Sequence, residues 1–392
     1  MDFLALLSNF DFIWNTLLPF LVALTILVFV HEMGHFSVAR WCNVRVEVFA
    51  VGFGPELKGW TDKYGTRWKI CAIPLGGYVK MFGESESIKN QQGEEVRPMT
   101  DQEKAVSFHH KSLWQRTAIV FAGPFINFVF AVFTFAMLFI FAGVPQIDPD
   151  RPLLAVVGDV SAGSAADTAG LQRGDLFIEV AGEKINVFSD LQRIIGSNPG
   201  VAVSIKIVRA EKEIVITATP ASKKVTADDG TKTVRGVLGV TNDPGEVEYI
   251  KKGVFESIWL GVERTYMLTV QILDFVGNII FGEQSAKDLG GIIRIAQISG
   301  QVAELGLASF ISFIAVLSVN LGIINLFPIP LLDGGHLAFY AVEAIRGRPL
   351  GEKVQEYGFR FGLVFVVALF LFVTWNDLVQ LKFFEFISEL LT

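Results

Sequence analysis

Long uncharged stretches of the sequence mark the segments that can cross a lipid bilayer. A helix needs roughly 20 apolar residues to cross the hydrocarbon layer. Charged side chains are absent over 19 residues from Phe12 to Val30, 31 from Thr117 to Ile147, 28 from Leu305 to Leu332 and 16 from Phe361 to Asn376. The last stretch reaches a sufficient length if its helix begins near Tyr357 and Arg360 extends its guanidinium to the interface. The pattern therefore predicts four transmembrane helices.

A fifth apolar segment, Val254–Phe281, contains charged residues and allows two interpretations. Its charges are Glu256, Glu263, Arg264 and Asp274. Charges every turn or two are typical of a helix that lies in the membrane interface, so we expect interfacial amphipathic helices over residues 246–303. A helix that spans the bilayer is the alternative for 254–281.

Alternating apolar and polar positions predict β-structure in two connections. Val44–Phe49 and Trp68–Ala72 alternate with period two next to glycine-rich turns, which indicates a β-hairpin beside the membrane. Between the second and third spans, short strand-like runs flank a helix-like segment, Ser189–Ile195. This pattern predicts one α+β domain, and the sequence holds no second copy of it.

The chain is thus expected to be a polytopic α-helical membrane protein with a membrane-associated β-hairpin region and one small α+β domain. Its eight segments, in order, are a first transmembrane helix (1–41), the β region with a loop (42–115), a second transmembrane helix (116–147), the α+β domain (148–245), interfacial helices (246–303), a third transmembrane helix (304–336), a cytosolic connection (337–356) and a fourth transmembrane helix with a tail (357–392).

Basic residues orient this arrangement in the membrane. Twelve Lys and Arg lie from Arg40 to Arg116 and four from Gly334 to Arg360, whereas none precedes Phe12 and Lys382 alone follows Asn376. Connections rich in Lys and Arg stay in the cytosol. We therefore expect both termini and the α+β domain on the outer side. The N-terminal apolar run lacks the basic leader of a cleavable signal peptide.

Composition narrows the class of protein further. Of 392 residues, 51% are hydrophobic and 19% charged, and the net charge is -7. These values exclude a disordered chain and a nucleic-acid-binding protein. Cys42 and Cys71 are too few for a disulfide framework, and both fall on the expected cytosolic side as reduced thiols.

The sequence His31-Glu32-Met33-Gly34-His35 stands at the end of the first span. Residues four apart share one face of a helix, so His31 and His35 can bind one metal ion. Glu32 lies beside them, where it can take a proton from a metal-bound water. The alternative is a pair of interfacial histidines. It is disfavoured because ionisable residues in an apolar helix are costly and usually functional.

A hydrolytic zinc site needs a third protein ligand and an open position for water. Asp333 is the first charge after the third uncharged stretch, at the same end of the bundle as His31. Pro328 and Pro330 break the helix there, which is tolerated only inside protein or beside a cavity. Gly334 and Gly335 are expected to let the chain approach the metal closely. His336 is either a further ligand or a packing residue.

Asparagines within the spans are candidates for contact with a substrate. Each of Asn320 and Asn325 can either hold a developing oxyanion or form an interhelical hydrogen bond, and the first role is favoured for Asn325. For Asn127, in Gly123-Pro124-x-x-Asn127, helix packing is the favoured interpretation. His109 and His110 are adjacent and are expected at the cytosolic surface.

Seven segments together resemble the site-2 protease family of intramembrane zinc metalloproteases, in particular its bacterial RseP-type members with a PDZ domain. They are HEMGH at 31–35, VGFGP at 51–55, IPLGGYVKM at 73–81, FAGPFINF at 121–128, AGLQRGD at 169–175, LGG at 289–291 and SVNLGIINLFPIPLLDGGH at 318–336. RseP-type proteins with two PDZ domains are known, whereas this chain has one, so a tandem-PDZ mechanism is not expected to apply here.

The resemblance implies a specific site. His31, His35 and Asp333 would hold one Zn²⁺, Glu32 would act as general base and acid, and Asn325, with Asn320, would lie near the scissile peptide bond. The hairpin would receive the substrate as an added strand. The residues implied in substrate binding are Gly52, Phe53, Gly54, Gly76, Gly77, Tyr78, Asn320 and Pro328.

The resemblance also implies an activity and partners. The protein would cleave single-pass membrane proteins, such as anti-sigma factors or remnant signal peptides, in a bacterial inner membrane. Its zinc site would lie near the cytosolic side. The PDZ domain, in the periplasm, would bind peptide termini and admit substrates that a site-1 protease has already trimmed.

Two other classes of protein are weighed against this one. A catalytically silent PDZ scaffold with a structural metal has no need of Glu32 as a base, and it would more often fill the fourth metal position with protein. A metal transporter would need acidic residues along a path, whereas charge within the spans gathers at one depth. Substitution of Glu32 distinguishes the three.

Overall fold

The computed structural model describes residues 13–83, 87–89, 95–146, 155–226, 232–242, 248–282 and 289–380. Its chain forms two compact units, one of Met1–Ala142 with Lys252–Thr392 and the other of Gly143–Lys251. The first 12 residues and the tail after residue 380, for which the sequence predicts an outer location, lie outside the described residues.

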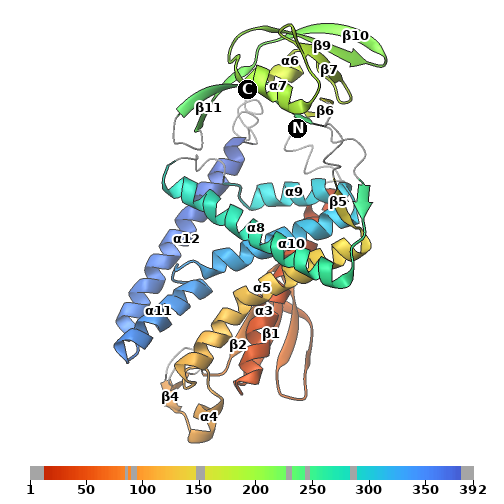
Figure 1. Cartoon of the computed structure of the whole chain (residues 1–392). Helices are drawn as coiled ribbons and strands as arrows, with labels where there is room; N and C mark the ends of the chain where they lie inside the picture. The colour runs from red at the N-terminus through yellow and green to blue at the C-terminus, as the bar shows by residue number, and fades with distance from the viewer. Residues whose placement is uncertain are drawn as a thin grey trace, which may run out of the picture. The chain divides into compact units, whose positions relative to one another are not determined.

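The first unit is a helical bundle, as the uncharged stretches predict. Within the described residues, four helices are long and apolar enough to cross a membrane. They are a π-helical turn (Ile13–Leu17) continued by α3 (Leu18–Trp41), α5 (Leu113–Phe141), α10 (Leu307–Leu326) and α12 (Glu352–Gln380). Helix α5 lies between α3 and α10 and packs against both (Figure 1).

The segment predicted as the third transmembrane helix contains a break. Helix α10 ends at Leu326, and a second helix, α11 (Asp333–Arg346), begins at Asp333. Pro328 and Pro330 cause the break because proline cannot donate a backbone hydrogen bond inside a helix. A Cβ atom at Gly334 would lie 2.3 Å from the Leu326 carbonyl oxygen. Gly334 and Gly335 therefore permit this tight turn, in which a larger side chain would meet the backbone of residues 326–330.

A long β-hairpin packs beside α3 (Figure 1). Strands β1 (Val46–Thr61) and β2 (Arg67–Met81) pair antiparallel, as the alternating pattern predicts. Phe49 is fully buried where the hairpin meets Phe36 of α3, and its ring stacks on Trp68 with centroids 4.5 Å apart. A small subdomain then leads to α5, formed by β3 (Ser87–Lys89), β4 (Glu95–Pro98) and α4 (Asp101–Val106).

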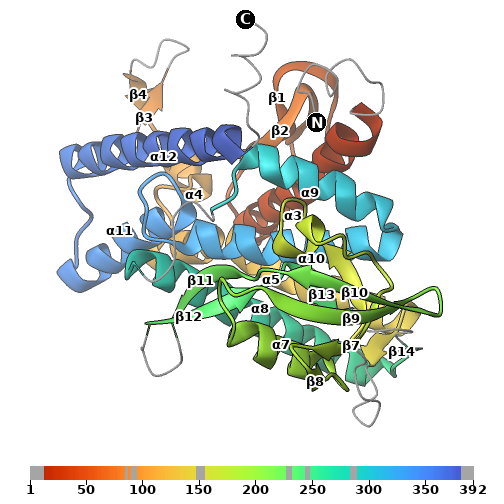
Figure 2. The same ribbon diagram turned by 90° about the horizontal axis from the view of Figure 1, so that it is seen from above.

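The second unit has the predicted α+β composition. Its main sheet has the order β10-β9-β7-β8, and three further strand pairs, β6–β13, β11–β12 and β5–β14, complete it. The strands are β5 (Val144–Gln146), β6 (Val157–Val160), β7 (Leu176–Val180), β8 (Glu183–Lys184), β9 (Val203–Arg209), β10 (Lys212–Ala218), β11 (Ala221–Thr226), β12 (Lys232–Val237), β13 (Val240–Asn242) and β14 (Glu248–Ile250). Helices α6 (Ala165–Thr168) and α7 (Phe188–Gly196) complete the unit (Figure 2). Phe177, Ile205 and Ile207 are buried at the centre of its core.

Two helices follow the second unit in the chain, α8 (Val254–Ile280) and α9 (Ile292–Glu304). Helix α8 presents a narrow buried stripe of small residues, Ser257, Gly261 and Thr265, and packs against α5. A Cβ atom at Gly261 would lie 2.7 Å from the Val132 carbonyl oxygen, so glycine permits this close contact. The rest of α8 exposes both aromatic and charged residues.

Candidate metal centre

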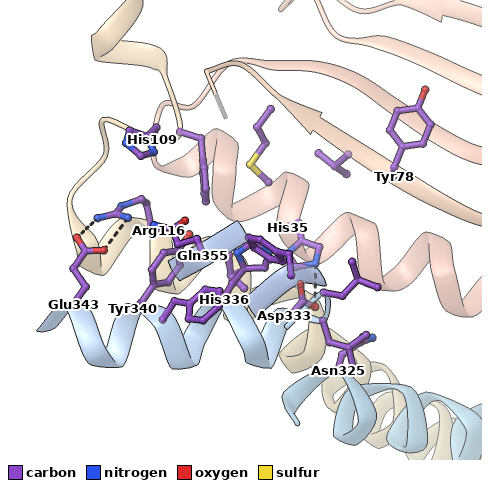
Figure 3. Close-up of a pocket in the computed structure, with 18 of the residues that line it drawn as sticks. His35, Tyr78, His109, Arg116, Asn325, Asp333, His336, Tyr340, Glu343 and Gln355 are labelled. Atoms are coloured by element: carbon purple, nitrogen blue, oxygen red, sulfur yellow. Dashed lines mark hydrogen bonds and ion pairs between the residues drawn. The ribbon is translucent and has the colours of Figure 1, made fainter. Parts of the chain in front are cut away.

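Two helices bring three metal-binding side chains together. His31 and His35 lie one turn apart on α3, and Asp333 is the first residue of α11. The two Nε2 atoms are 3.2 Å apart, and the Asp333 Oδ2 atom lies 3.1 Å from that of His31 and 3.5 Å from that of His35. Figure 3 shows the side chains of His35 and Asp333 pointing toward one another. The distant pairing predicted from the sequence is therefore present.

These three donors fit a tetrahedral divalent metal. With metal–ligand bonds of about 2.0–2.1 Å, neighbouring ligand atoms of a tetrahedron are roughly 3.3 Å apart. The three observed separations, from 3.1 to 3.5 Å, bracket that value. Asp333 Oδ2 is also one of two buried side-chain polar atoms, within the described residues, that have no hydrogen-bond partner. A buried carboxylate oxygen in that state is suited to binding a cation.

Glycines allow α3 and α5 to approach closely at this site. A Cβ atom at Gly34 would lie 2.3 Å from the carbonyl oxygen of Ala122, and one at Gly123 would lie 2.2 Å from His35 Nε2. Any side chain at Gly123 would therefore displace the imidazoles. The motif that begins at Gly123 borders the metal centre and does more than pack two helices together.

Both imidazoles are held through their second nitrogen. The Nδ1 atom of His35 lies 2.9 Å from the backbone oxygen of Ile119, and the Nδ1 atom of His31 lies 3.1 Å from the side-chain amide of Asn127. Asn127 is fully buried on α5. The sequence interpretation of Asn127 as a packing residue overlooked this contact. A polar amide in the second span, at the depth of the His31 motif, was the available signal.

A cavity of about 620 Å³ opens beside the three ligands. Glu32, Asn325, Tyr78 and His336 line it together with His31, His35 and Asp333. Figure 3 shows Asn325 beside Asp333 and Tyr78 on the hairpin side of the cavity. His336 is outside the three-residue cluster that could hold a metal. Its ring packs against Phe359, with centroids 5.2 Å apart.

The far end of the cavity is polar. Arg116, just inside the start of α5, donates hydrogen bonds to Glu343 of α11, one of them at 3.2 Å, and its guanidinium lies over the ring of Tyr340 (Figure 3). Burial, the largest influence, raises the pKa of Tyr340. His109, predicted to be a surface residue, also lines this end.

The other residues predicted for substrate binding, all of them described, lie outside the lining of this cavity: Gly52, Phe53, Gly54, Gly76, Gly77, Asn320 and Pro328. Gly77 nevertheless packs against α3, because a Cβ atom there would lie 3.6 Å from Glu32 Cγ and 2.9 Å from a methyl group of Val28. Strand β2 therefore passes next to Glu32.

An ion pair fixes the hairpin to the end of α3. Arg40 donates a hydrogen bond to Asp62 in the hairpin turn and another, at 3.0 Å, to Thr66. Desolvation alone would raise the pKa of Asp62. Hydrogen bonds from the Trp68 indole, from the backbone N–H groups of Tyr64 and Thr66 and from Arg40 outweigh it and lower this pKa to about 2. The carboxylate is thus ionised and anchors the turn.

Comparisons with known proteins cover almost the whole chain. Residues 19–369 match the profile of peptidase family M50. A protein of Agrobacterium fabrum named as a zinc metalloprotease is 43% identical, over 94% of this chain and 97% of its own length. The regulator of sigma E protease of Salmonella typhi is 33% identical over 94% of this chain and 99% of its own length. A PDZ domain from Listeria monocytogenes, 20% identical, aligns with 24% of this chain and 93% of its own at a TM-score of 0.19.

Proposed function

Because the chain belongs to peptidase family M50, we propose that it is an intramembrane zinc metalloendopeptidase that carries out regulated proteolysis of single-pass membrane proteins. It is a membrane protein, with four helices among the described residues long and apolar enough to cross a bilayer. The observation that carries the proposal is the meeting of His31, His35 and Asp333 beside Glu32 in one cavity.

His31, His35 and Asp333 are the residues that would hold Zn²⁺, since their two nitrogen atoms and one oxygen atom face one another across 3.1–3.5 Å. When bound, zinc supplies a Lewis acid that polarises a peptide carbonyl and lowers the pKa of water. Three protein ligands leave a fourth position open, which distinguishes a hydrolytic zinc site from a structural one.

Glu32 is the proton carrier in this scheme. It lines the cavity next to both histidines, so its carboxylate can accept a proton from the attacking water while the oxygen of that water bonds to the peptide carbonyl carbon. As the carbon–nitrogen bond breaks, Glu32 returns the proton to the leaving nitrogen. The products are one new carboxyl group and one new amine.

Asn325 and the hairpin would orient the substrate. Asn325 lies beside Asp333 in the same cavity, where its amide N–H can stabilise the negative charge that develops on the carbonyl oxygen (Figure 3). A peptide bond inside a helix is hidden by its own hydrogen bonds, so cleavage requires local unwinding. Strand β2 at Gly77 and Tyr78 passes next to Glu32, where it can pair with the unwound segment.

The topology proposed is that of a bacterial inner-membrane protein with both termini and the Gly143–Lys251 unit on the outer side. The excess of Lys and Arg between the first two spans supports this orientation. We assign the outer unit as a PDZ domain from its AGLQRGD segment and its α+β topology. It would bind the ends of substrates already trimmed by another protease. Helix α8 would lie in the membrane interface, because aromatic and charged residues share its exposed surface.

The decisive experiment replaces Glu32 with Gln in the purified full-length chain. Cleavage of single-pass helices in lipid vesicles should fall by at least about 10²-fold, the usual contribution of a general base, while bound zinc stays at one ion per chain. Glu256→Gln, on the exposed surface of α8, is the matched control and should cleave normally.

Three outcomes would contradict the proposal. Equal cleavage by wild type and the Glu32 variant would remove the assigned base. Zinc bound without cleavage by the wild type would favour the silent scaffold, and zinc flux across the vesicle membrane would favour the transporter.

A further inference from the structure

The contact between Asn127 and His31 joins two helices at the metal centre. Asn127 lies on α5, its side chain is fully buried, and its amide nitrogen is 3.1 Å from His31 Nδ1. Its amide oxygen, Oδ1, is the other buried side-chain polar atom without a hydrogen-bond partner in the described parts of the chain.

Binding of a metal places a requirement on the His31 ring. Its Nε2 atom faces His35 and Asp333, so Nε2 must be free of its proton in order to ligate. The neutral ring then carries its proton on Nδ1, and this N–H needs a hydrogen-bond acceptor in a buried site. For His35, the backbone oxygen of Ile119 meets the same need at 2.9 Å.

We propose that Asn127 is a positioning residue that selects the metal-binding tautomer of His31. The amide nitrogen of Asn127 faces Nδ1, and an N–H₂ group that donates there leaves the ring proton on Nε2, toward Asp333 Oδ2. A half-turn of the amide exchanges two groups of similar size and brings Oδ1 to Nδ1, where it accepts the N–H. The site thus passes from a metal-free to a metal-binding hydrogen-bond pattern by the rotation of one side chain.

The surroundings of Asn127 hold its backbone in place for this role. Its carbonyl oxygen accepts a hydrogen bond of 2.9 Å from the hydroxyl of Ser318 on α10. Gly123, one turn earlier on α5, leaves room for the two rings. This inference rests on the proposed function, in that His31 must be a metal ligand, and it adds a residue that contacts neither the metal nor the substrate.

The test measures zinc affinity by competition with a chromophoric chelator, on full-length protein in detergent. Asn127→Leu keeps the size of the side chain and removes the acceptor, so zinc affinity should fall by about 10–100-fold, as is usual when an outer partner of a ligand is lost. Asn127→Asp supplies a carboxylate acceptor to Nδ1 and should restore affinity to within about threefold of wild type. Ser299→Ala, which removes a buried hydroxyl on α9 that donates to Ile295 of the same helix, is the matched control and should bind zinc normally.

Two further readouts separate positioning from a merely structural role. The visible absorption of Co²⁺ bound in place of zinc should change shape in Asn127→Leu, because the His31 ring is reoriented, and should return in Asn127→Asp. Unfolding of the metal-free variants should match wild type. Wild-type zinc affinity in Asn127→Leu, or equal losses in the Leu and Asp variants, would overturn the inference and leave the proposed function intact. If the wild type binds no zinc, both would fall.

Discussion

Asp175 in the second unit and Asp333 in the first are both largely buried aspartates, yet their surroundings are opposite. The side chain of Asp175 is completely buried and receives hydrogen bonds from Arg209 at 2.6 and 2.7 Å and from the backbone of Gln172 at 2.8 Å. That of Asp333 is 18% exposed and faces two imidazoles, and its Oδ2 atom has no hydrogen-bond partner among the described residues.

The difference separates a structural carboxylate from a functional one. A buried charge stabilises a fold only when its partner and hydrogen bonds compensate for the loss of solvation, as they do for Asp175. Asp333 Oδ2 faces only the two imidazoles, so its charge is compensated far less than that of Asp175 until a cation binds. Sites of function commonly depart from the rules that stability imposes elsewhere in a protein. The comparison therefore predicts opposite consequences for substitution of the two residues.

The largest effect is expected for Asp333→Asn. Loss of the negatively charged ligand should lower zinc affinity by more than about 100-fold and should abolish cleavage. This loss is larger than the one expected when a residue that only contacts a ligand is replaced. Chelator competition and cleavage in vesicles measure the two effects. Thermal unfolding of the metal-free variant should stay close to that of metal-free wild type, because the charge that is removed has only the two imidazoles as partners and an amide fills the same space.

A lower unfolding temperature for metal-free Asp333→Asn would contradict this contrast, since it would make Asp333 a structural residue like Asp175. The control is Asp101→Asn, a fully exposed aspartate in the first turn of α4, which should change neither zinc affinity nor cleavage.

Asp175→Ala should have the next largest effect and the opposite character. Arg209 would lose its charged partner and keep its hydrogen bond to the Gly170 carbonyl oxygen, which costs about 3 kcal/mol, at the lower end of such losses because 29% of its side chain is exposed. The second unit should unfold at a lower temperature than in wild type, which limited proteolysis measures. Zinc affinity should be unchanged. Replacement of both residues, Asp175→Leu with Arg209→Met, should recover part of the loss. No recovery would show that the two residues do not act as a pair.

The parts of the site that follow from local sequence could be predicted. The spacing of His31 and His35 places both on one helix face whatever the tertiary structure, and Asp333 was found because it is the first charge after a long uncharged stretch. The hairpin followed from period-two alternation around Val46 and Trp68. Each of these signals lies within one segment of the chain.

The parts that depend on how helices cross could not be predicted. Asn127 and His31 are 96 residues apart, and they meet because Gly34 and Gly123 let α3 and α5 approach. Helix α11 was missed as well, because residues 337–356 were expected to form a cytosolic connection. Residues of α11 as far as Glu343 line the cavity because α11 packs against α5. No pattern within one segment of the sequence predicts that contact.

A third aspartate, Asp62, lies between the two extremes and sharpens the comparison. It is 19% exposed, about as much as Asp333, but it is satisfied by hydrogen bonds as Asp175 is. Its folded pKa of about 2 lies below the ordinary value of 3.8, so the unfolded turn binds a proton more readily than the folded one. The stabilisation is therefore complete above about pH 4 and is lost as the pH falls toward 2, by at most about 2 kcal/mol.

Hydrogen exchange of the turn amides of Tyr64 and Thr66, which donate to Asp62 Oδ1, measures this effect. Their protection should decrease by up to about 15-fold between pH 5 and pH 2.5, the size expected from the pKa difference. Asp62→Asn removes the titrating group, so its protection should be lower at pH 5 and nearly constant over this range. If wild type and Asp62→Asn respond equally to acid, the hydrogen bonds to Asp62 do not hold the turn. In that case a partly exposed aspartate would add no stability even when it accepts several hydrogen bonds. The hydrogen bonds of an aspartate would then no longer predict the effect of replacing it.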